Sequence, residues 1–461
     1  MNELLDYATY VPAYRFAPGS IGNRIVASFD EDSTTMAVDA ARLLTSPARS
    51  NPTQLLLCTS SPAYMDKTNA TAVHAALGLD EQVPAADMVG TARSSVAAIR
   101  SALSQGGLVA MADVRVGKPG SGDERTGADL AAALLFGQGP GIAEILAVSS
   151  TTAEFLDRWR EPNERNGSQW EERFGSNIYR SLVVDTAARA LSDGGVEQAD
   201  HVVVTSGSTV VRKAAMKWVR GRLDTTVAPV GFSGASDVGV ALASMLDIAR
   251  AGETVLVLSA VDGCDAILLR TTDLLPERRQ QSPLTTQLRD GLPVDQVRYL
   301  GWRGLVDPEL PRRPEPSRPA GPPSSRGAGW KFSLDGSRCT VCQFMHLPPA
   351  RVCRECGIVD AMATVKVSDK EATVATFTVD RLAYSPSPPL VGVIVDFDGG
   401  GRCALEVADA SPDELSIGDR VDLVFRRMYT TGGVHNYFWK ARVIRPPAVT
   451  RPLPTVEEAI R

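Results

Sequence analysis

Two pairs of cysteines constrain this chain more than any other feature. Cys339 and Cys342 form one CxxC turn ("CTVC"), Cys353 and Cys356 form a second ("CREC"), and ten residues separate the pairs. Two CxxC turns at this spacing can place four thiolates around one tetrahedral ion, the closed geometry of a structural zinc site. Because a closed site has no open coordination position for water, we expect the zinc to stabilise a small domain and not to take part in catalysis.

Length and charge narrow the class of protein. The 461 residues are enough for two or three domains, and the net charge of −6 argues against a surface built mainly for nucleic acid. No run of about 18 apolar residues predicts a membrane-spanning helix, and the first residues show no basic start followed by an apolar core, so no secretory signal is expected. Zinc-binding thiolates suit a reducing compartment, which predicts a cytoplasmic protein.

The first 306 or so residues alternate between strand-like and helix-like patterns. The strand candidates are the short apolar runs 54–60, 107–114, 129–137, 143–150, 201–207 and 253–261. Asp32 or Ser33 can cap a helix in which Met36, Ala37, Ala40, Ala41 and Leu44 share one face. Further helices are expected within 95–103, 210–223 and 239–252. This alternation predicts an α/β domain over residues 1–306, with sheets covered by helices, and no internal repeat is apparent.

A proline-rich stretch then interrupts the pattern. Seven prolines fall between Pro308 and Pro323, so we expect neither a helix nor a central strand there. Residues 307–328 are therefore predicted to form an extended, semi-rigid linker with a reach on the order of 45–50 Å.

The C-terminal part of the chain reads as a zinc ribbon followed by a small barrel. The ribbon spans 329–360, the barrel 361–447, and a poorly ordered tail 448–461. The strand candidates of the barrel are 371–379, 390–398, 402–409, 420–428 and 437–444. "DGGGR" (398–402) between two of them indicates a hairpin. Five short strands in a segment of this length fit an all-β OB-fold.

Several N-terminal motifs carry a resemblance to a known family. "SFDEDSTTMAVDAARLL", "CTSSPAYMDKTNATAVHAALGL" and "VGFSGASDVGVALASML" are among the segments by which residues 10–310 resemble hydroxymethylglutaryl-CoA synthases of the thiolase superfamily. The resemblance implies two similar α/β halves, each with a sheet between helices. It also implies carbon–carbon bond formation between acyl-CoA units. In that family a cysteine carries the acyl group, a glutamate moves a proton and a histidine assists.

The C-terminal region carries a second resemblance. "CTVCQFMHLPPARVCRECG" and "YSPSPPLVGVIVDFDGG" resemble the acyl-CoA-associated OB-fold proteins with a rubredoxin-like zinc ribbon. The resemblance covers about residues 331–446. It implies a subunit that accompanies a thiolase or a related condensing or aldolase enzyme.

The positions that correspond to the family's catalytic residues are altered. The nucleophilic cysteine corresponds to Ala92, the glutamate to Ser60, and the histidine to Val204 or Thr205. An alanine methyl holds no acyl group, and a serine does not accept a proton near neutral pH as a carboxylate does. Ser60 and Ala92 are therefore interpreted as vestigial positions, and no catalytic or cofactor-binding residue is assigned.

A fourth family position is altered as well. The asparagine that precedes the family's "SG" turn corresponds to Pro229 or Val230.

Together these features predict an accessory subunit that does not catalyse a reaction alone. We expect it to belong to an acyltransferase complex with a thiolase-family protein whose active-site cysteine is intact, as a hetero-oligomer. It would position or channel acyl-CoA for carbon–carbon bond cleavage or formation, so a CoA thioester is a possible ligand besides zinc. Neither nucleic acid nor a membrane is expected as a partner.

Two alternatives stay open at this point. In the first, the chain is an active condensing or thiolytic enzyme with rearranged residues, for which Cys58 at a strand end, Cys264 in an expected loop and His201 are candidates. In the second, the chain is a nucleic-acid-binding zinc-ribbon OB protein. The charged and aromatic residues for that role are Arg338, Arg351, Arg354, Arg426, Arg427, Tyr437, Phe438 and Trp439.

Overall fold

The computed structural model describes residues 2–17, 24–162, 164–170, 172–222, 224–227, 230–289 and 291–444, of which 172–174 and 224–227 as backbone only. Pro229 and the expected tail lie outside the described residues. The chain forms two compact units. Unit 1 comprises Met1–Asp335, Leu382–Pro388 and Phe425–Phe438, and unit 2 comprises Gly336–Arg381, Pro389–Val424 and Trp439–Arg461. The domain boundaries expected from the sequence stay a prediction.

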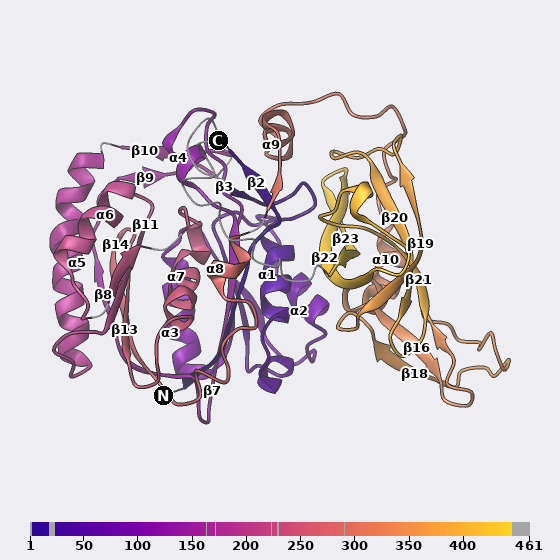
Figure 1. Ribbon diagram of the computed structural model, residues 1–461, viewed down its shortest axis with the longest axis horizontal. Coiled ribbons are helices and arrows are strands. Elements are labelled where there is room, and N and C mark those ends of the chain that lie inside the picture. Colours follow the sequence, from indigo (N-terminus) through magenta and orange to yellow (C-terminus); the bar gives the residue numbers. More distant parts are fainter. Residues whose placement is uncertain are drawn as a thin grey trace, which may run out of the picture. The chain divides into compact units, whose positions relative to one another are not determined.

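A ten-stranded mixed sheet forms the centre of unit 1 (Figure 1). Its order is β12-β11-β13-β14-β8-β1-β7-β6-β4-β5. The strands are β1 (Glu3–Tyr10), β4 (Leu55–Thr59), β5 (Ala85–Val89), β6 (Gly107–Asp113), β7 (Leu130–Gly137), β8 (Ala143–Thr152), β11 (His201–Ser206), β12 (Asp224–Val227), β13 (Thr254–Ala260) and β14 (Gly263–Thr271). The six strands predicted for this region are confirmed as β4, β6, β7, β8, β11 and β13. Every residue of β4, β6, β11 and β13 is buried, whereas β8 is buried only in part.

Helices cover the sheet in three layers. They are α1 (Ser33–Arg42), α2 (Ala70–Leu77), α3 (Ser94–Gln105), α5 (Glu172–Asp193), α6 (Thr209–Trp218) and α7 (Asp237–Leu246). Helices α1 and α2 pack on the half of the sheet that contains β6, whereas α5 and α6 pack on the half that contains β14 and β11. Helices α3 and α7 lie between the two halves and contact each other (Figure 1). This layering is the α/β architecture that the sequence predicts.

The two halves of unit 1 repeat one topology, although no repeat is apparent in the sequence. In the first half β4 pairs in parallel with β5 and β6, and β7 pairs antiparallel with β6 and β1. In the second half β11 pairs in parallel with β12 and β13, and β14 pairs antiparallel with β13 and β8. The two similar halves that the family resemblance implies are thus present, and no residue repeat accompanies them because many apolar sequences satisfy the same strand and helix positions.

One local expectation for unit 1 is wrong and another is confirmed. Cys264 does not lie in a loop but in the buried strand β14, where it pairs with Thr151 of β8. Helix α1 begins at its expected cap, Asp32, whose side chain accepts from the Thr35 backbone N–H (3.0 Å). However, every residue from Ser33 to Ala41 is buried, so α1 has no solvent-facing side.

The proline-rich stretch differs in part from its expected conformation. Residues 307–320 contain neither helix nor strand, but α10 (Gly321–Arg326) is a short helix with proline in its first turn. The prediction failed there because proline is tolerated in the first helical turn, where the missing N–H has no intrahelical acceptor.

Unit 2 contains the ribbon and most of the barrel, whose segment Phe425–Phe438 in β22 and β23 is part of unit 1. The ribbon sheet has the order β17-β16-β18, with β16 (Asp335–Cys339), β17 (Met345–His346) and β18 (Met362–Lys366). The barrel sheet has the order β21-β20-β19-β22-β23, with β19 (Ala372–Asp380), β20 (Leu390–Phe397), β21 (Arg402–Glu406), β22 (Arg420–Thr431) and β23 (Val434–Val443). A parallel bridge between Val407 and Ala441 joins its two edges. The five predicted strands and the hairpin at Gly399–Gly401, all three with positive φ, are confirmed.

Smaller elements complete the described chain. Two small sheets are formed by β2 (Tyr14–Phe16), β3 (Arg24–Val26) and β15 (Leu292–Pro293), and by β9 (Arg158–Trp159) and β10 (Ser168–Gln169). The short helices are α4 (Gly122–Thr126), α8 (Leu284–Gln287), α9 (Gln296–Trp302), a π-turn at Gly329–Ser333, and 3-10 turns at Pro47–Ser50, Gly234–Ser236 and Pro412–Glu414.

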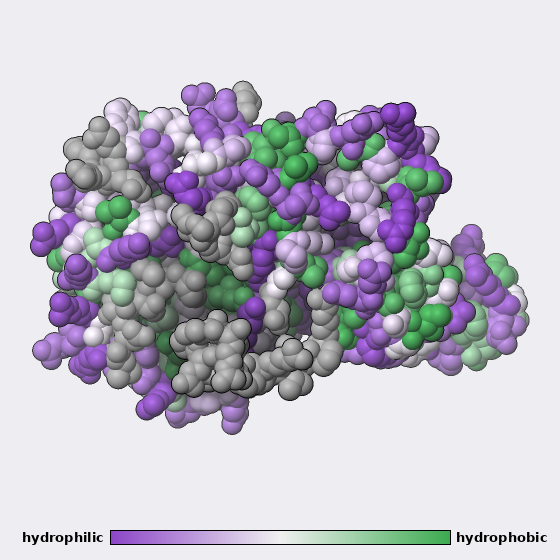
Figure 2. Space-filling model, turned by 45° about the horizontal axis from the view of Figure 1, so that its top comes forward, coloured by the Kyte–Doolittle hydropathy of each residue, from purple (hydrophilic) through white to green (hydrophobic). Residues whose placement is uncertain are grey.

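The surface view adds one observation about hydropathy. On the face shown in Figure 2, hydrophilic side chains are spread widely and apolar ones form small groups. Among the described residues, no helix has both the length and the apolar character needed to cross a bilayer.

Candidate functional site

A cavity of about 300 Å³ lies in unit 1 where several strands end. Its lining includes residues at or just after the ends of five strands. These are Ser60 after β4, Gly90–Ala92 after β5, Arg115 after β6, Gly207 after β11, and Ala260–Asp262 at the end of β13. Because the carboxyl ends of parallel strands β4, β5, β11 and β13 meet there, the topology itself creates a place for a ligand. The other lining residues are Asp157–Arg160, Gly167, Tyr179, Phe232 and Gly234.

Ser60 and Ala92, the two positions that the sequence analysis interprets as vestigial, both line this cavity. Ala92 precedes α3, which begins at Ser94, so the positive end of the helix dipole faces the cavity. Val204 and Thr205, the expected histidine position, are buried within β11 and only Gly207 beyond them reaches the cavity. None of the described residues that line the cavity is a cysteine, a histidine or a glutamate.

Asp113 holds the vestigial serine in place. Its carboxylate accepts from Ser60 N (2.7 Å), Ser60 Oγ (2.7 Å), Thr59 Oγ1 (2.8 Å) and Ala235 N (2.7 Å). A Cβ at Gly234, where φ is +63°, would lie 2.0 Å from Asp113 Oδ2, so the close approach requires glycine. With these bonds made, Ser60 is a buried structural donor, and its hydroxyl is not positioned to act as a base.

Three arginines dominate one side of the cavity. Arg115 donates from Nη1 to Ser60 Oγ (3.0 Å) and lies over the Phe232 ring at 5.1 Å. Arg158 lies 5.5 Å from the same ring and donates to Asp123 Oδ2 (2.7 Å). Arg160 donates to the backbone oxygen of Ser60. Burial lowers the pKa of Arg115, and the neighbouring Arg158 and Arg160 lower it further, while Asp113 and Asp123 oppose the shift.

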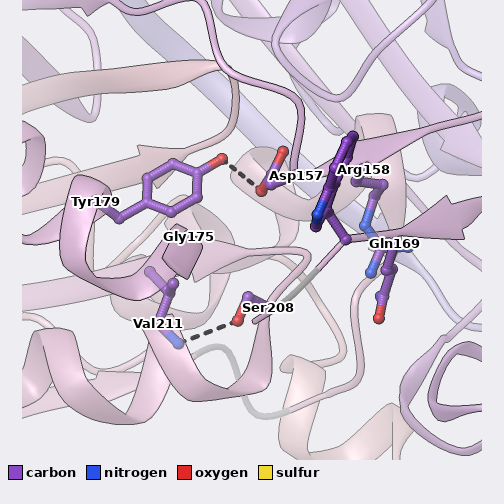
Figure 3. Close-up of a pocket in the computed structure, with 8 residues that line it drawn as sticks. Asp157, Arg158, Gln169, Gly175, Tyr179, Ser208 and Val211 are labelled. Atoms are coloured by element: carbon purple, nitrogen blue, oxygen red, sulfur yellow. Dashed lines mark hydrogen bonds between the residues drawn. The ribbon is translucent and has the colours of Figure 1, made fainter. Parts of the chain in front are cut away.

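Two aspartates, Asp157 and Asp262, also line the cavity. Asp157 accepts from the Tyr179 hydroxyl (3.0 Å), and Figure 3 shows Asp157 pointing to Tyr179 while Arg158 points away from it, beside Gln169. Asp262 has the left-handed backbone conformation (φ 50°), which is strained for a residue with a side chain. Burial raises the pKa of Asp262, and the nearby Asp157 raises it further. The cavity therefore has two charged groups of side chains. Arg115, Arg158 and Arg160 form the cationic wall, and Asp157 and Asp262 form the acidic wall.

The rearranged nucleophiles that the sequence left open lie elsewhere. Cys58 and Cys264 are wholly buried in β4 and β14, and burial raises the pKa of each thiol to about 12. Neither lines the cavity. His201 begins β11, at the end of the strand away from Gly207, and its Nε2 lies 2.9 Å from Glu253 Oε2. A nucleophile that is neutral and out of reach of the cavity cannot attack a substrate there.

The four CxxC cysteines converge in unit 2, as their spacing predicts. Their Sγ atoms lie within 4.8 Å of one another, with 3.6 Å between Cys339 and Cys356 and 3.4 Å between Cys342 and Cys353. A tetrahedron of sulfurs at the Zn–S distance of about 2.3 Å has edges of about 3.8 Å, so a metal ion of this kind fits the cluster. All four are free thiols.

The two CxxC turns share one backbone pattern. Cys339 N donates to Phe344 O (2.9 Å) and Gln343 N donates to Cys339 O (3.0 Å); Cys353 N and Gly357 N make the equivalent bonds (2.9 and 3.0 Å). Gln343 and Gly357 both have positive φ. The Cys342 backbone N–H donates to Cys339 Sγ (3.5 Å), a contact that favours the thiolate form that binds metal.

Three of the residues proposed for nucleic-acid contact are buried. Arg426 and Trp439 are wholly buried and Tyr437 is nearly so. Arg426 is paired with Asp39 (2.6 Å), and the exposed Arg351 is paired with Asp360 (2.6 Å). The described structure thus gives no support to a stacking platform formed by these side chains.

Sequence reasoning missed the residues that give the cavity its charge. Three separate segments of the chain supply them: one holds Arg115, one holds Arg158 and Arg160, and one holds Phe232, whose ring lies under two of the arginines. The only local signal is the run "DRWR" (157–160), in which two arginines alternate with an acidic and an aromatic residue. Nothing in the sequence indicates that this run lies beside Arg115.

Comparison with known sequences places the similarity in the first two thirds of the chain. A hydroxymethylglutaryl-CoA synthase of Pyrobaculum aerophilum is 24% identical over 341 residues, covering 66% of this chain and 97% of the relative. The synthase of Archaeoglobus fulgidus is 28% identical over 344 residues, covering 66% and 99%. That of Methanopyrus kandleri is 29% identical over 323 residues, covering 61% and 91%.

Comparison with solved structures and with a domain family agrees with this. An HMG-CoA synthase complexed with CoA has a TM-score of 0.57 at 14% identity, covering 65% of this chain and 89% of that one. The 3-oxoacyl-(acyl carrier protein) synthase III of Pseudomonas aeruginosa PAO1 has a TM-score of 0.51 at 18% identity, covering 59% and 98%. Residues 364–426 match the family described as the C-terminal OB-fold domain of ChsH2. The thiolase-like fold and the OB-fold predicted from the sequence are confirmed.

Proposed function

We propose that this chain, an HMG-CoA synthase-like, thiolase-type domain joined to a ChsH2-type OB-fold domain, is a non-catalytic accessory subunit of a thiolase-family enzyme complex. In this role it binds an acyl-CoA and positions or channels it, while a partner with an intact active-site cysteine makes or breaks the carbon–carbon bond. The four-thiolate cluster fits the reducing environment of the cytoplasm.

One observation carries this proposal. The cavity at the strand ends contains Ala92 and Ser60, and its described lining offers no cysteine, histidine or glutamate. Covalent acyl transfer requires a nucleophile and a base within hydrogen-bond reach of each other. The described lining can therefore bind an acyl thioester, and it supplies carboxylates from Asp157 and Asp262, but it offers no thiol to carry an acyl group.

Similar proteins support the choice of ligand and partner. One structurally similar HMG-CoA synthase was solved with CoA, and another, MvaS, with 3-hydroxy-3-methylglutaryl coenzyme A. The OB-fold match and the zinc-ribbon resemblance favour a thiolase-family partner. We assign zinc to Cys339, Cys342, Cys353 and Cys356, because four thiolates with tetrahedral spacing prefer zinc in a closed structural site.

Incubation of the purified chain with radiolabelled acetyl-CoA should leave no covalent acyl-protein. Ala92 has no sulfur, and the thiols of Cys58 and Cys264 are buried and protonated near neutral pH. The measurement is protein-bound radioactivity after denaturing gel electrophoresis, with Cys58→Ala and Cys264→Ala as controls. Stable label that disappears in either variant would establish the rearranged-enzyme alternative instead.

Purification from native lysate should recover a second polypeptide of the thiolase superfamily with an intact cysteine. Thiolase-type domains pair through large, mostly apolar interfaces, and a domain without catalytic groups serves the complex through such a surface. Mass spectrometry identifies the partner. The variant Ala92→Cys should change neither the complex nor its turnover. Recovery of this chain alone as a homodimer would contradict the proposal.

A further inference from the structure

Resting on the proposed acyl-CoA binding, we propose that the cavity selects acyl groups that end in a free carboxylate, which Arg115, Arg158 and Arg160 hold at the cationic wall. The substrate class is therefore a dicarboxylic acyl thioester and not a simple fatty acyl thioester.

The arginines have charge left to neutralise. Arg158 is paired with Asp123, but Arg115 and Arg160 donate only to oxygens of Ser60 and, for Arg160, to Glu164 O (3.4 Å). Neither has a carboxylate within ion-pair distance among the described residues. Guanidinium groups that crowd together in a half-buried cavity are stabilised by an anion, and their planar forks suit a carboxylate.

Phe232 orients two of the three guanidinium groups. Arg115 and Arg158 both lie over this ring, at 5.1 and 5.5 Å from its centroid. Ser60 adds a second constraint, because its hydroxyl accepts from Arg115 and its backbone oxygen accepts from Arg160. The serine that replaces the family's glutamate thus removes a negative charge and helps to hold the positive ones.

The acidic wall sets the direction of the ligand. Asp157 and Asp262 face the same cavity, beside Tyr179 and Thr91. A carboxylate is repelled from that side and attracted to the arginine side, whereas a hydroxyl or amide N–H of the ligand can donate to the acids. The N-terminus of α3 next to Ala92 adds a weak preference for negative charge.

The size of the cavity favours the acyl group as the source of the anion. A volume of about 300 Å³ is at the lower limit of small-molecule pockets. A short acyl chain is closer to this volume than a whole coenzyme A is. An acyl carboxylate and a phosphate share the chemistry that arginine recognises, so the test has to separate them.

Calorimetric titration of the full-length chain with a matched pair of thioesters tests this inference. Glutaryl-CoA and pentanoyl-CoA have acyl chains of equal carbon number and differ in the terminal carboxylate. We expect glutaryl-CoA to bind about 10- to 100-fold more tightly, the range of a charge-assisted hydrogen bond pair. Inorganic phosphate should not displace glutaryl-CoA at the concentrations at which glutaryl-CoA binds.

Variants locate the preference at the arginines. Arg115→Met and the exposed Arg160→Met should each reduce the glutaryl-CoA preference about tenfold or more, and Arg115→Lys should keep part of it. Arg100→Met is the matched control, because Arg100 lies on α3 and donates to Ser150 Oγ away from the cavity. It should leave the preference unchanged. Arg160→Met keeps the test valid if Arg115→Met fails to fold.

The outcomes separate this inference from the proposed function. Equal binding of the two thioesters overturns the carboxylate preference and leaves acyl-CoA binding intact. Competition by phosphate with loss of the preference assigns the arginines to the coenzyme and also overturns it. No binding of either thioester overturns both this inference and the acyl-CoA role of the chain.

Discussion

Replacing Arg426 with leucine should lower the free energy of unfolding of the full chain by about 3–5 kcal/mol. The guanidinium has no exposed surface and pairs with Asp39 (2.6 Å), Glu31 (3.2 Å) and Asp30 (3.8 Å) within unit 1. It also donates to Tyr10 Oη (2.8 Å). Removing this buried cation takes an ion-pair partner from three buried carboxylates, of which Asp39 also lies 3.9 Å from Arg42, and such a loss costs more than the pair itself contributes. Urea denaturation followed by circular dichroism measures the loss.

Matched variants test the cause of that loss. Arg298→Leu removes a half-exposed arginine of unit 1 that pairs with Asp295 at 3.6 Å, and it should change stability by no more than about 1 kcal/mol. Asp39→Asn in the Arg426→Leu background should recover part of the stability, because it removes one of the uncompensated charges. A loss below about 1 kcal/mol in Arg426→Leu, or no recovery in the double variant, would mean that these charges are compensated in another way.

Cys353→Ser should remove the bound zinc and unfold the ribbon. Each chain should carry one zinc ion, and a structural site in a peptide of this size binds with an apparent free energy of about 10–16 kcal/mol. A ribbon of some 30 residues has too little apolar core to stay folded without it. Elemental analysis should show loss of the metal, and hydrogen exchange should show loss of protection in β16–β18 while β4 and β6 stay protected.

Cys403→Ser is the control for this experiment. Cys403 is a half-buried cysteine in β21 of the same unit and is not part of the four-cysteine cluster. The variant should keep its metal and its exchange pattern. Iron in the wild-type chain, or a well-folded wild-type chain without any metal, would contradict the zinc assignment.

Local patterns in the sequence determined much of this protein. The CxxC spacing predicts the four-thiolate cluster because a CxxC turn places both sulfurs by its own backbone geometry. Apolar runs predict strands such as β4 and β13, and Asp32 predicts the start of α1, because these signals lie within a few residues of each other.

Long-range packing decided the rest. The sequence indicates one apolar face on α1, yet Phe425–Phe438 belongs to the same unit and the helix is buried on all sides, with Asp39 paired to Arg426 across 387 positions. Arg426 accordingly reads as a surface cation in the sequence, and only its tertiary partners show that it is a buried one.

The candidate site was likewise predicted in part from the sequence, and the rest of it is visible only in the tertiary structure. Ala92 and Ser60 were identified from motifs, and the loss of a nucleophile and a base follows from residue identity alone. The cationic wall depends on the arginines after β6 and around β9, which are more than 40 positions apart in the sequence. Their approach is fixed by the order of the strands in the sheet, a property of the whole chain that no local window contains.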